Sequence, residues 1–176
     1  MNKSVSISKQ ILIFLCIVLL FSMTSCQKEM SYFEDIHIGM SRNEIMERNK
    51  DLKDPQISEE DYIVYKDIKY NSLSGETSYT FDRDGELIHS SIIFIAKEKE
   101  SPQIYNKLVK DLSIEYGEST TLYENTTMWK IEDHEKEGYI LCLLDRINDN
   151  ISLIMCTPEI YDWIVTFKSV SSQRIE

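Results

Sequence analysis

The sequence predicts an α+β fold, in which two tandem units of one helix and three strands form an antiparallel sheet with the helices packed on one face. Three observations support this prediction. A capping box at Ser41 opens one helix, an apolar pattern from Ile104 to Tyr116 marks a second, and three strand-like runs follow each helix. Because the same order of elements occurs twice in a chain of one-domain length, we expect a repeated architecture.

The first unit is expected to span residues 36–98. Ser41 and Glu44 stand three positions apart, so each side chain can accept a hydrogen bond from the backbone N–H of the other residue. A helix is therefore expected to begin at Arg42. Three runs with strand character follow this helix: Tyr62–Tyr70, Thr77–Phe81 and Leu87–Ile95. A hairpin turn at Asp84-Gly85 joins the last two runs, because glycine accepts the positive φ that such turns require.

The second unit is expected to span residues 99–158 and to repeat this order. Ser101 is placed at the N-cap and Pro102 at the first helical position, and apolar residues then recur every three or four positions as far as Tyr116. Gly117 ends the helix, since glycine adopts the left-handed conformation without steric cost. Three strand-like runs complete the unit: Thr127–Ile131, Tyr139–Ile147 and Ile151–Thr157.

Residues 1–25 are expected to be a cleaved signal peptide. Two lysines give a basic start, and the apolar run from Ile11 to Phe21 has the length of a signal-peptide core but is too short to cross a bilayer. The tetrapeptide Met23–Cys26 resembles the processing site of a bacterial lipoprotein, in which the cysteine thiol receives a diacylglycerol before cleavage. The mature protein would then begin at a lipidated Cys26. The alternative is an ordinary secretory signal that is cut before an unmodified cysteine.

Lipidation of Cys26 would place the protein at the cell envelope. At least two acyl chains, such as palmitate, are needed for stable attachment, and a diacylated or triacylated cysteine meets this requirement. Residues 26–35 are expected to form a polar tether. Within it, Gln27-Lys28-Glu29 resembles a short charged signal that displays some bacterial lipoproteins on the cell surface. We therefore expect the outer membrane in preference to the inner membrane, with surface display or an ordinary tether as alternatives.

The charge of the chain argues against nucleic acid as a partner. The formal net charge is −11, and it becomes −13 once Lys3 and Lys9 are removed with the signal peptide. Such a surface repels phosphate groups, and no cluster of basic residues interleaved with aromatic residues offsets the repulsion. The same charge repels anionic lipid, so attachment to the membrane is expected to depend on the acyl chains.

Two cysteines remain in the predicted domain besides Cys26. Cys142 and Cys156 lie at equal distances from Asp149, so a hairpin centred there would place them opposite each other and allow a disulfide. The alternative is that both are small buried hydrophobic residues. No metal site and no cofactor are expected, because the histidines are far apart and none has a second ligand at zinc-like spacing: His37, His89 and His134.

A short segment resembles a known lipoprotein family. Residues 36–45 read IHIGMSRNEI, which is similar to the GM[ST]xxE[VI] segment that opens the helix in BamE/SmpA-like outer-membrane lipoproteins and in the broader beta-lactamase-inhibitor-like fold. Glu115-Tyr116-Gly117 resembles the end of the corresponding helix, and the order of elements extends the likeness over residues 33–157. The family's Leu-Gly-x-Pro turn is replaced here by Arg48–Leu52. The resemblance implies a small envelope lipoprotein of tandem helix-plus-meander repeats that binds other proteins and performs no chemistry.

The C-terminal segment, residues 159–176, carries the clearest aromatic pattern. Tyr161, Trp163 and Phe167 stand at alternating positions, so an extended strand would place them on one face. Such a strand would either complete the core or form an open interaction surface. In the second case tyrosine and tryptophan would serve as hot spots, and an edge strand could bind a partner by strand addition. Trp129, in the second meander, is expected in the core.

Two functions from different classes follow from these observations. The favoured function is a lipid-anchored, non-enzymatic interaction module, such as an assembly factor, accessory subunit or inhibitor, with a protein partner in the envelope. The alternative is a protein that binds or hydrolyses envelope glycans, with surface carboxylates such as Asp133 and Glu135 beside an aromatic platform from the C-terminal segment. No catalytic residue is assigned, because the sequence contains neither a nucleophile elbow nor a glycine-rich phosphate loop.

Overall fold

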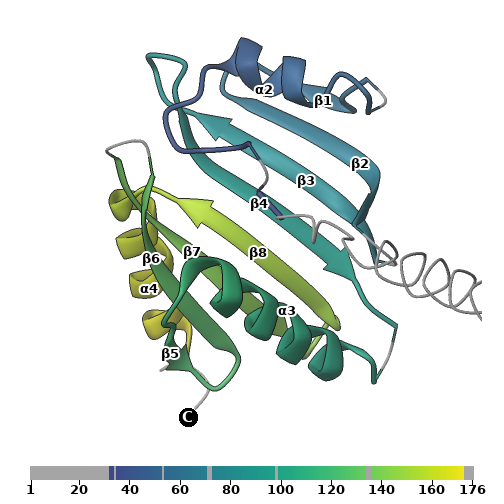
Figure 1. The fold of residues 1–176 in the computed structure, drawn as a ribbon, viewed down its shortest axis with the longest axis vertical. Helices are drawn as coiled ribbons and strands as arrows, with labels where there is room; N and C mark the ends of the chain where they lie inside the picture. The colour runs from purple at the N-terminus through teal and green to yellow at the C-terminus, as the bar shows by residue number, and fades with distance from the viewer. Residues whose placement is uncertain are drawn as a thin grey trace, which may run out of the picture. The chain divides into compact units, whose positions relative to one another are not determined.

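The computed structural model describes residues 32–33, 35–52, 54–70, 73–97, 99–133 and 136–172. Within these ranges the chain has the predicted α+β class, with three helices and one antiparallel sheet of eight strands (Figure 1). The predicted signal peptide, Cys26 and the tether as far as Ser31 lie outside the described residues. His134, Glu135 and the side chain of Phe167 lie outside them as well.

The first half of the fold contains one helix and four strands: α2 (Arg42–Arg48), β1 (Ile57–Ser58), β2 (Tyr62–Tyr70), β3 (Leu73–Phe81) and β4 (Leu87–Ile95). The predicted capping box is confirmed. The backbone N–H of Ser41 donates to Oε2 of Glu44 at 2.8 Å, and the backbone N–H of Glu44 donates to Oγ of Ser41 at 3.4 Å. Gly85 has a φ of 77° in the β3–β4 turn, as predicted. The sequence did not predict β1, and β3 begins before the expected Thr77.

The second half contains two helices and four strands: α3 (Ser101–Tyr116), β5 (Thr120–Tyr123), β6 (Thr126–Asp133), β7 (Lys136–Asp145), β8 (Asn150–Cys156) and α4 (Pro158–Ser172). Helix α3 ends at Tyr116, and Gly117 caps it with a positive φ of 83°, as predicted. Ser101 is the first helical residue rather than the N-cap. Its Oγ donates to Oδ1 of Asp149 at 2.7 Å, and this bond ties the start of α3 to the β7–β8 turn.

The strands follow the order β1-β2-β3-β4-β8-β7-β6-β5. The last strand of each half therefore lies at the centre of the sheet, where β4 and β8 pair antiparallel with Ile92 opposite Leu153. The two edges are formed by the shortest strands, β1 and β5. Short edge strands offer little unpaired backbone to another chain, which protects the sheet against unwanted pairing.

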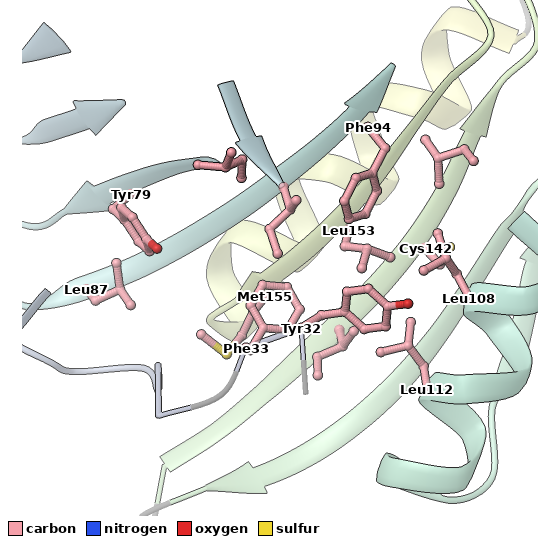
Figure 2. Close-up of a cluster of buried hydrophobic side chains, with 14 of the residues drawn as sticks. Tyr32, Phe33, Tyr79, Leu87, Phe94, Leu108, Leu112, Cys142, Leu153 and Met155 are labelled. Atoms are coloured by element: carbon pink, nitrogen blue, oxygen red, sulfur yellow. The ribbon is translucent and has the colours of Figure 1, made fainter. Parts of the chain in front are cut away.

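The main hydrophobic core lies on the sheet face that α3 covers (Figure 2). Ile45 of α2 and Leu112 of α3 are fully buried in it, and Tyr32 and Phe33 from the segment before α2 lie among the same side chains. Trp129 of β6 is fully buried, as predicted. Two helices and the segment that leads into the fold thus share one apolar cluster.

The C-terminal segment is a helix, so the predicted strand is wrong. Helix α4 begins at Pro158, and the backbone N–H of Tyr161 donates to the carbonyl oxygen of Thr157 at 3.0 Å. Helical spacing brings Ile160 and Ile164 onto the sheet, where they pack in a second cluster with residues of β5 to β8. This cluster lies on the face opposite α3, and Figure 1 shows α4 behind β6 and β7. The expectation that the helices share one face therefore fails for α4.

Candidate interaction surface

One face of β2, β3 and β4 carries no helix among the described residues. Side chains alternate along a strand, so residues that point away from the main core share this face, which we call the helix-free face. Its centre is formed by Tyr62, Val64, Ser78, Thr80, His89 and Ser91, and Glu76, Ile93 and Ile95 continue it toward the end of β4. Strands β1 to β4 contribute nothing to the described cluster beneath α4. Among the described residues, helices cover the second half of the sheet on both faces and the first half on one. On the helix-free face Val64 and Ser91 are nevertheless only 4% and 8% exposed, whereas Ser78 and Thr80 are half-buried.

Short polar side chains occupy the centre of the helix-free face. Oγ of Ser78 and Oγ of Ser91 lie 2.8 Å apart across β3 and β4, and Oγ1 of Thr80 lies 3.4 Å from Nδ1 of His89. Val64 lies beside Ser78 across the strand pair. These side chains are small and uncharged, and depletion of charge is typical of the centre of a protein–protein interface.

His89 is the titratable residue at the centre of this face. It stands opposite Cys156 in the β4–β8 pairing, close to the start of α4. Burial lowers the pKa of His89 below its ordinary value of 6.5, because desolvation disfavours the charged imidazolium. A neutral imidazole is therefore the form that the folded protein favours.

We expect acid to weaken the fold through His89. The unfolded chain binds a proton near pH 6.5, whereas the folded protein binds it only at lower pH. The neutral His89 therefore costs the folded protein no stability above pH 6.5. As the pH falls from 6.5 through the folded pKa, the unfolded chain takes up the proton first and the free energy of unfolding decreases. Within this window the free energy of unfolding should fall by up to ~1.4 kcal/mol per pH unit. Urea denaturation at a series of pH values measures the slope, which should be shallower in His89→Asn. Equal slopes in the two proteins would contradict the prediction.

The structure separates the aromatic residues that the sequence placed on one surface. Tyr161 stacks on Tyr139 of β7, with ring centroids 4.1 Å apart and an angle of 17° between the planes. Trp163 is 64% exposed, and it lies on another side of α4 because two residues turn a helix by about 200°. The side chain of Phe167 lies outside the described residues. Strand addition at this segment is excluded, since its backbone is helical.

The carboxylates of the glycan alternative are placed only in part. Asp133 ends β6, and Glu135 lies outside the described residues. Lys130 lies on the same strand, and its Nζ is 2.9 Å from Oε1 of Glu137 on the neighbouring strand β7. The hydrogen bond from Lys130 holds the pKa of Glu137 below its ordinary value. A general acid needs a raised pKa, so Glu137 does not suit that role.

Cys142 and Cys156 are both free and buried, so of the two alternatives the structure has the buried hydrophobic residues and not the disulfide. The β7–β8 turn occupies Arg146–Asp149, and the resulting register pairs Cys142 with Leu153 and Cys156 with Tyr139. Cys142 belongs to the main core and Cys156 to the cluster beneath α4. The two side chains therefore point to opposite faces of the sheet, and both act as small buried hydrophobic residues.

We expect both thiols to resist modification in the folded protein. Burial raises the pKa of Cys156 to about 12 and that of Cys142 still further above its ordinary value. At about pH 8 only about one Cys156 thiol in ten thousand is then ionised. In a Cys26→Ser protein without residues 1–25, DTNB should label neither thiol before denaturation and both thiols after it. Rapid labelling of the native protein, or an intact mass that matches a disulfide, would contradict this prediction.

No protein family, curated protein or solved structure matches this chain. Across the described ranges, no group of three or more His, Cys, Asp and Glu residues is placed to hold a metal ion. None of the helices in the described part of the chain is both long and apolar enough to cross a membrane. The function of the protein must therefore be inferred from its own sequence and geometry.

Proposed function

We propose that this protein is a lipid-anchored, non-enzymatic lipoprotein of the cell envelope, attached to the outer membrane, and that it acts as a protein-interaction module. The N-terminal sequence carries the proposal. A basic start, an apolar run of signal-peptide length and the tetrapeptide Met23–Cys26 together match the pattern of a lipoprotein leader. Acyl chains on Cys26 then anchor the mature protein, which begins at that residue.

The helix-free face supports the interaction part of the proposal. In the second half of the sheet, Ile160 and Ile164 of α4 cover Leu141 and Leu143 and complete a layer on that face. The described part of the first half has no corresponding helix. An antiparallel sheet can leave one face in water, and a partner that packs on β2 to β4 would cover this face as α4 covers the second half. The short uncharged side chains around Ser78 suit such a contact.

We also propose that the two halves are tandem repeats of one plan. Each half contains a helix followed by four strands, to which the second half adds α4, and α2 and α3 contribute to the same core. The last strands of the two halves pair with each other at the centre of the sheet. This arrangement supports the likeness to BamE/SmpA-like lipoproteins that rests on residues 36–45, and with it a role in binding envelope proteins.

Crosslinking in the native envelope tests the proposal. Tagged wild-type protein should recover a specific protein partner, and Ser78→Arg should abolish the recovery because it places a long charged side chain at the centre of the helix-free face. Ile114→Asp is the matched control, since Ile114 is 68% exposed on α3, away from this face. Recovery of no protein, or equal recovery with both variants, would count against the proposal. Circular dichroism should confirm that both variants are folded.

A further inference from the structure

One end of the sheet holds the point at which the N-terminal chain joins the fold. Tyr32 is 8% exposed, and its ring centroid lies 6.1 Å from those of both Tyr70 and Phe94. Tyr70 is the last residue of β2, and Phe94 is the last but one of β4. Tyr32 is therefore fixed near the end of the sheet where both strands finish. We call this the anchor end, and it comprises Tyr70, Leu73, Ile95 and the turn Arg146–Asp149.

The covalent chain keeps Cys26 near the anchor end. Tyr32 follows Cys26 by six positions, and an extended chain spans about 3.5 Å per residue, so the two residues lie at most about 20 Å apart. The opposite end of the sheet is further away, because a strand of nine residues such as β4 is about 30 Å long. If acyl chains on Cys26 lie in a bilayer, Tyr32 lies within about 20 Å of that bilayer. A domain whose opposite end faced the bilayer would hold Tyr32 about 30 Å away, which is more than the tether can span.

Two isoleucines protrude from the anchor end. Ile147 is 91% exposed and Ile95 is 69% exposed. Ile95 pairs with Asn150, the residue that follows the turn containing Ile147, so the two isoleucines occupy the same end of the sheet. Oδ1 of Asp145 accepts hydrogen bonds from the backbone N–H groups of Ile147, at 2.8 Å, and Asn148, at 3.3 Å. These bonds fix the turn so that the side chain of Ile147 stays exposed to water. Transfer of this apolar side chain from water into an apolar medium is favourable.

The opposite end of the sheet is acidic. Its β1–β2 and β3–β4 turns carry one cation, Arg83, and six carboxylates: Glu59, Glu60, Asp61, Asp82, Asp84 and Glu86. Oε2 of Glu86 lies 2.7 Å from Nζ of Lys136, so five of the six carboxylates are left to outweigh Arg83. Charges at the anchor end are mixed. Lys97 and Lys99 follow β4, and Arg146 in the turn pairs with Glu124 at 2.9 Å. An anionic bilayer therefore repels the opposite end more strongly than the anchor end.

We propose that the anchor end is a membrane-contacting surface, with Ile95 and Ile147 inserted into the headgroup region of a phospholipid bilayer. This proposal rests on the lipid anchor of the proposed function and adds the orientation of the folded domain. The acidic end then faces the aqueous side. Ile95 lies at the anchor end of the helix-free face, and the part of that face around Ser78 and Thr80 stays further from the bilayer, where a protein partner can reach it.

Hydrogen–deuterium exchange on vesicles of phosphatidylethanolamine and phosphatidylglycerol tests this orientation. The mature lipoprotein in these vesicles is compared with the soluble Cys26→Ser protein. The backbone N–H groups of residues 146–149 should exchange about tenfold more slowly on the membrane, whereas those of residues 82–86 should not change. Protection at residues 82–86 instead, or equal exchange at both ends, would overturn the proposal.

Matched variants separate insertion from simple proximity to the membrane. The double variant Ile95→Asp, Ile147→Asp should lose the protection, and the control Ile114→Asp should keep it. Protection that survives in the double variant would overturn the role of the two isoleucines.

Coupling through Cys26 separates this proposal from the lipid anchor itself. The protein without residues 1–25 can be joined by its Cys26 thiol to a maleimide lipid in the same vesicles, which makes the exchange test independent of natural acylation. Unmodified Cys26 in the natural protein would overturn the proposed anchor. Absence of protection in the coupled protein would overturn the membrane contact alone.

Discussion

Replacing Cys26 by serine is expected to release the protein from the membrane. The serine hydroxyl cannot take the place of the thiol that carries the diacylglycerol, so the variant receives no acyl chains. Each buried methylene contributes about 0.8 kcal/mol, so a palmitate-sized chain contributes on the order of 10 kcal/mol to membrane attachment. Cell fractionation and incorporation of labelled palmitate measure the effect. Wild-type protein should incorporate labelled palmitate and be found in the membrane fraction. The Cys26→Ser variant should incorporate no palmitate and be found in the soluble fraction.

The control for this experiment is Cys16→Ser. Cys16 lies in the apolar run of the predicted signal peptide and follows the bulky Leu15, which does not fit a processing site. This variant should be labelled and anchored like the wild-type protein, because residue 16 is removed with the signal peptide. A wild-type protein without label, or a Cys26→Ser protein that stays in the membrane, would refute the lipoprotein interpretation.

Replacing Phe94 by alanine is expected to lower the free energy of unfolding by about 3–5 kcal/mol. Phe94 is fully buried, and its ring lies edge-on to Tyr70 and Tyr32 at centroid distances of 5.7 Å and 6.1 Å. The substitution removes the buried ring and leaves a cavity between the sheet and the segment that enters the fold. The loss is large against the roughly 5–15 kcal/mol by which a folded protein is usually stable.

The adjacent residue provides the control for Phe94. Ile95 points to the other face of β4 and is 69% exposed, so Ile95→Ala should change the free energy of unfolding by less than about 1 kcal/mol. Urea denaturation followed by circular dichroism compares the two variants with the wild-type protein. If Phe94→Ala lowers the free energy of unfolding no more than Ile95→Ala does, the prediction that the Phe94 ring stabilises the core around Tyr32 is wrong.

Elements with strong local signals could be predicted from the sequence. The capping box at Ser41 and the glycine at position 117 locate helix ends, and alternating or continuous apolar runs locate the long strands. Strands β1 and β5 were missed because two and four residues are too short to show a period. The start of β3 was missed because Gly75 has the character of a turn residue. In the sheet, a Cβ at Gly75 would lie 2.1 Å from the carbonyl oxygen of Ile93, so glycine permits close approach of two strands there.

The C-terminal helix was missed because two patterns compete in the same segment. Alternating aromatic residues favoured a strand, whereas Pro158 at the first helical position, Glu159 in the first turn and the four-residue spacing of Ile160 and Ile164 favour a helix. Burial against the sheet decides in favour of the helix. The helix-free face could not be predicted either, since strand alternation does not reveal which half of the sheet α4 covers.

The pairing of Cys142 and Cys156 depended on the register of one hairpin. The sequence suggested a turn centred on Asp149, but the side chain of Asp145 closes a turn over residues 146–149 and shifts the register. Turn geometry sets strand register, and a shift by an odd number of residues moves a side chain to the other face. The choice between a disulfide and two free thiols therefore depended on a detail of backbone hydrogen bonding that the sequence does not show.

The central pairing of β4 with β8 has a consequence for biogenesis. A polypeptide that is exported N-terminus first delivers β4 about sixty residues before the strand that completes it, and β4 meanwhile presents an unpaired edge. If this chain is exported as proposed, the unpaired edge of β4 needs protection from aggregation until β8 has emerged. Truncation between β7 and β8 removes the partner of β4 at the centre of the sheet and should therefore lower the yield of soluble protein.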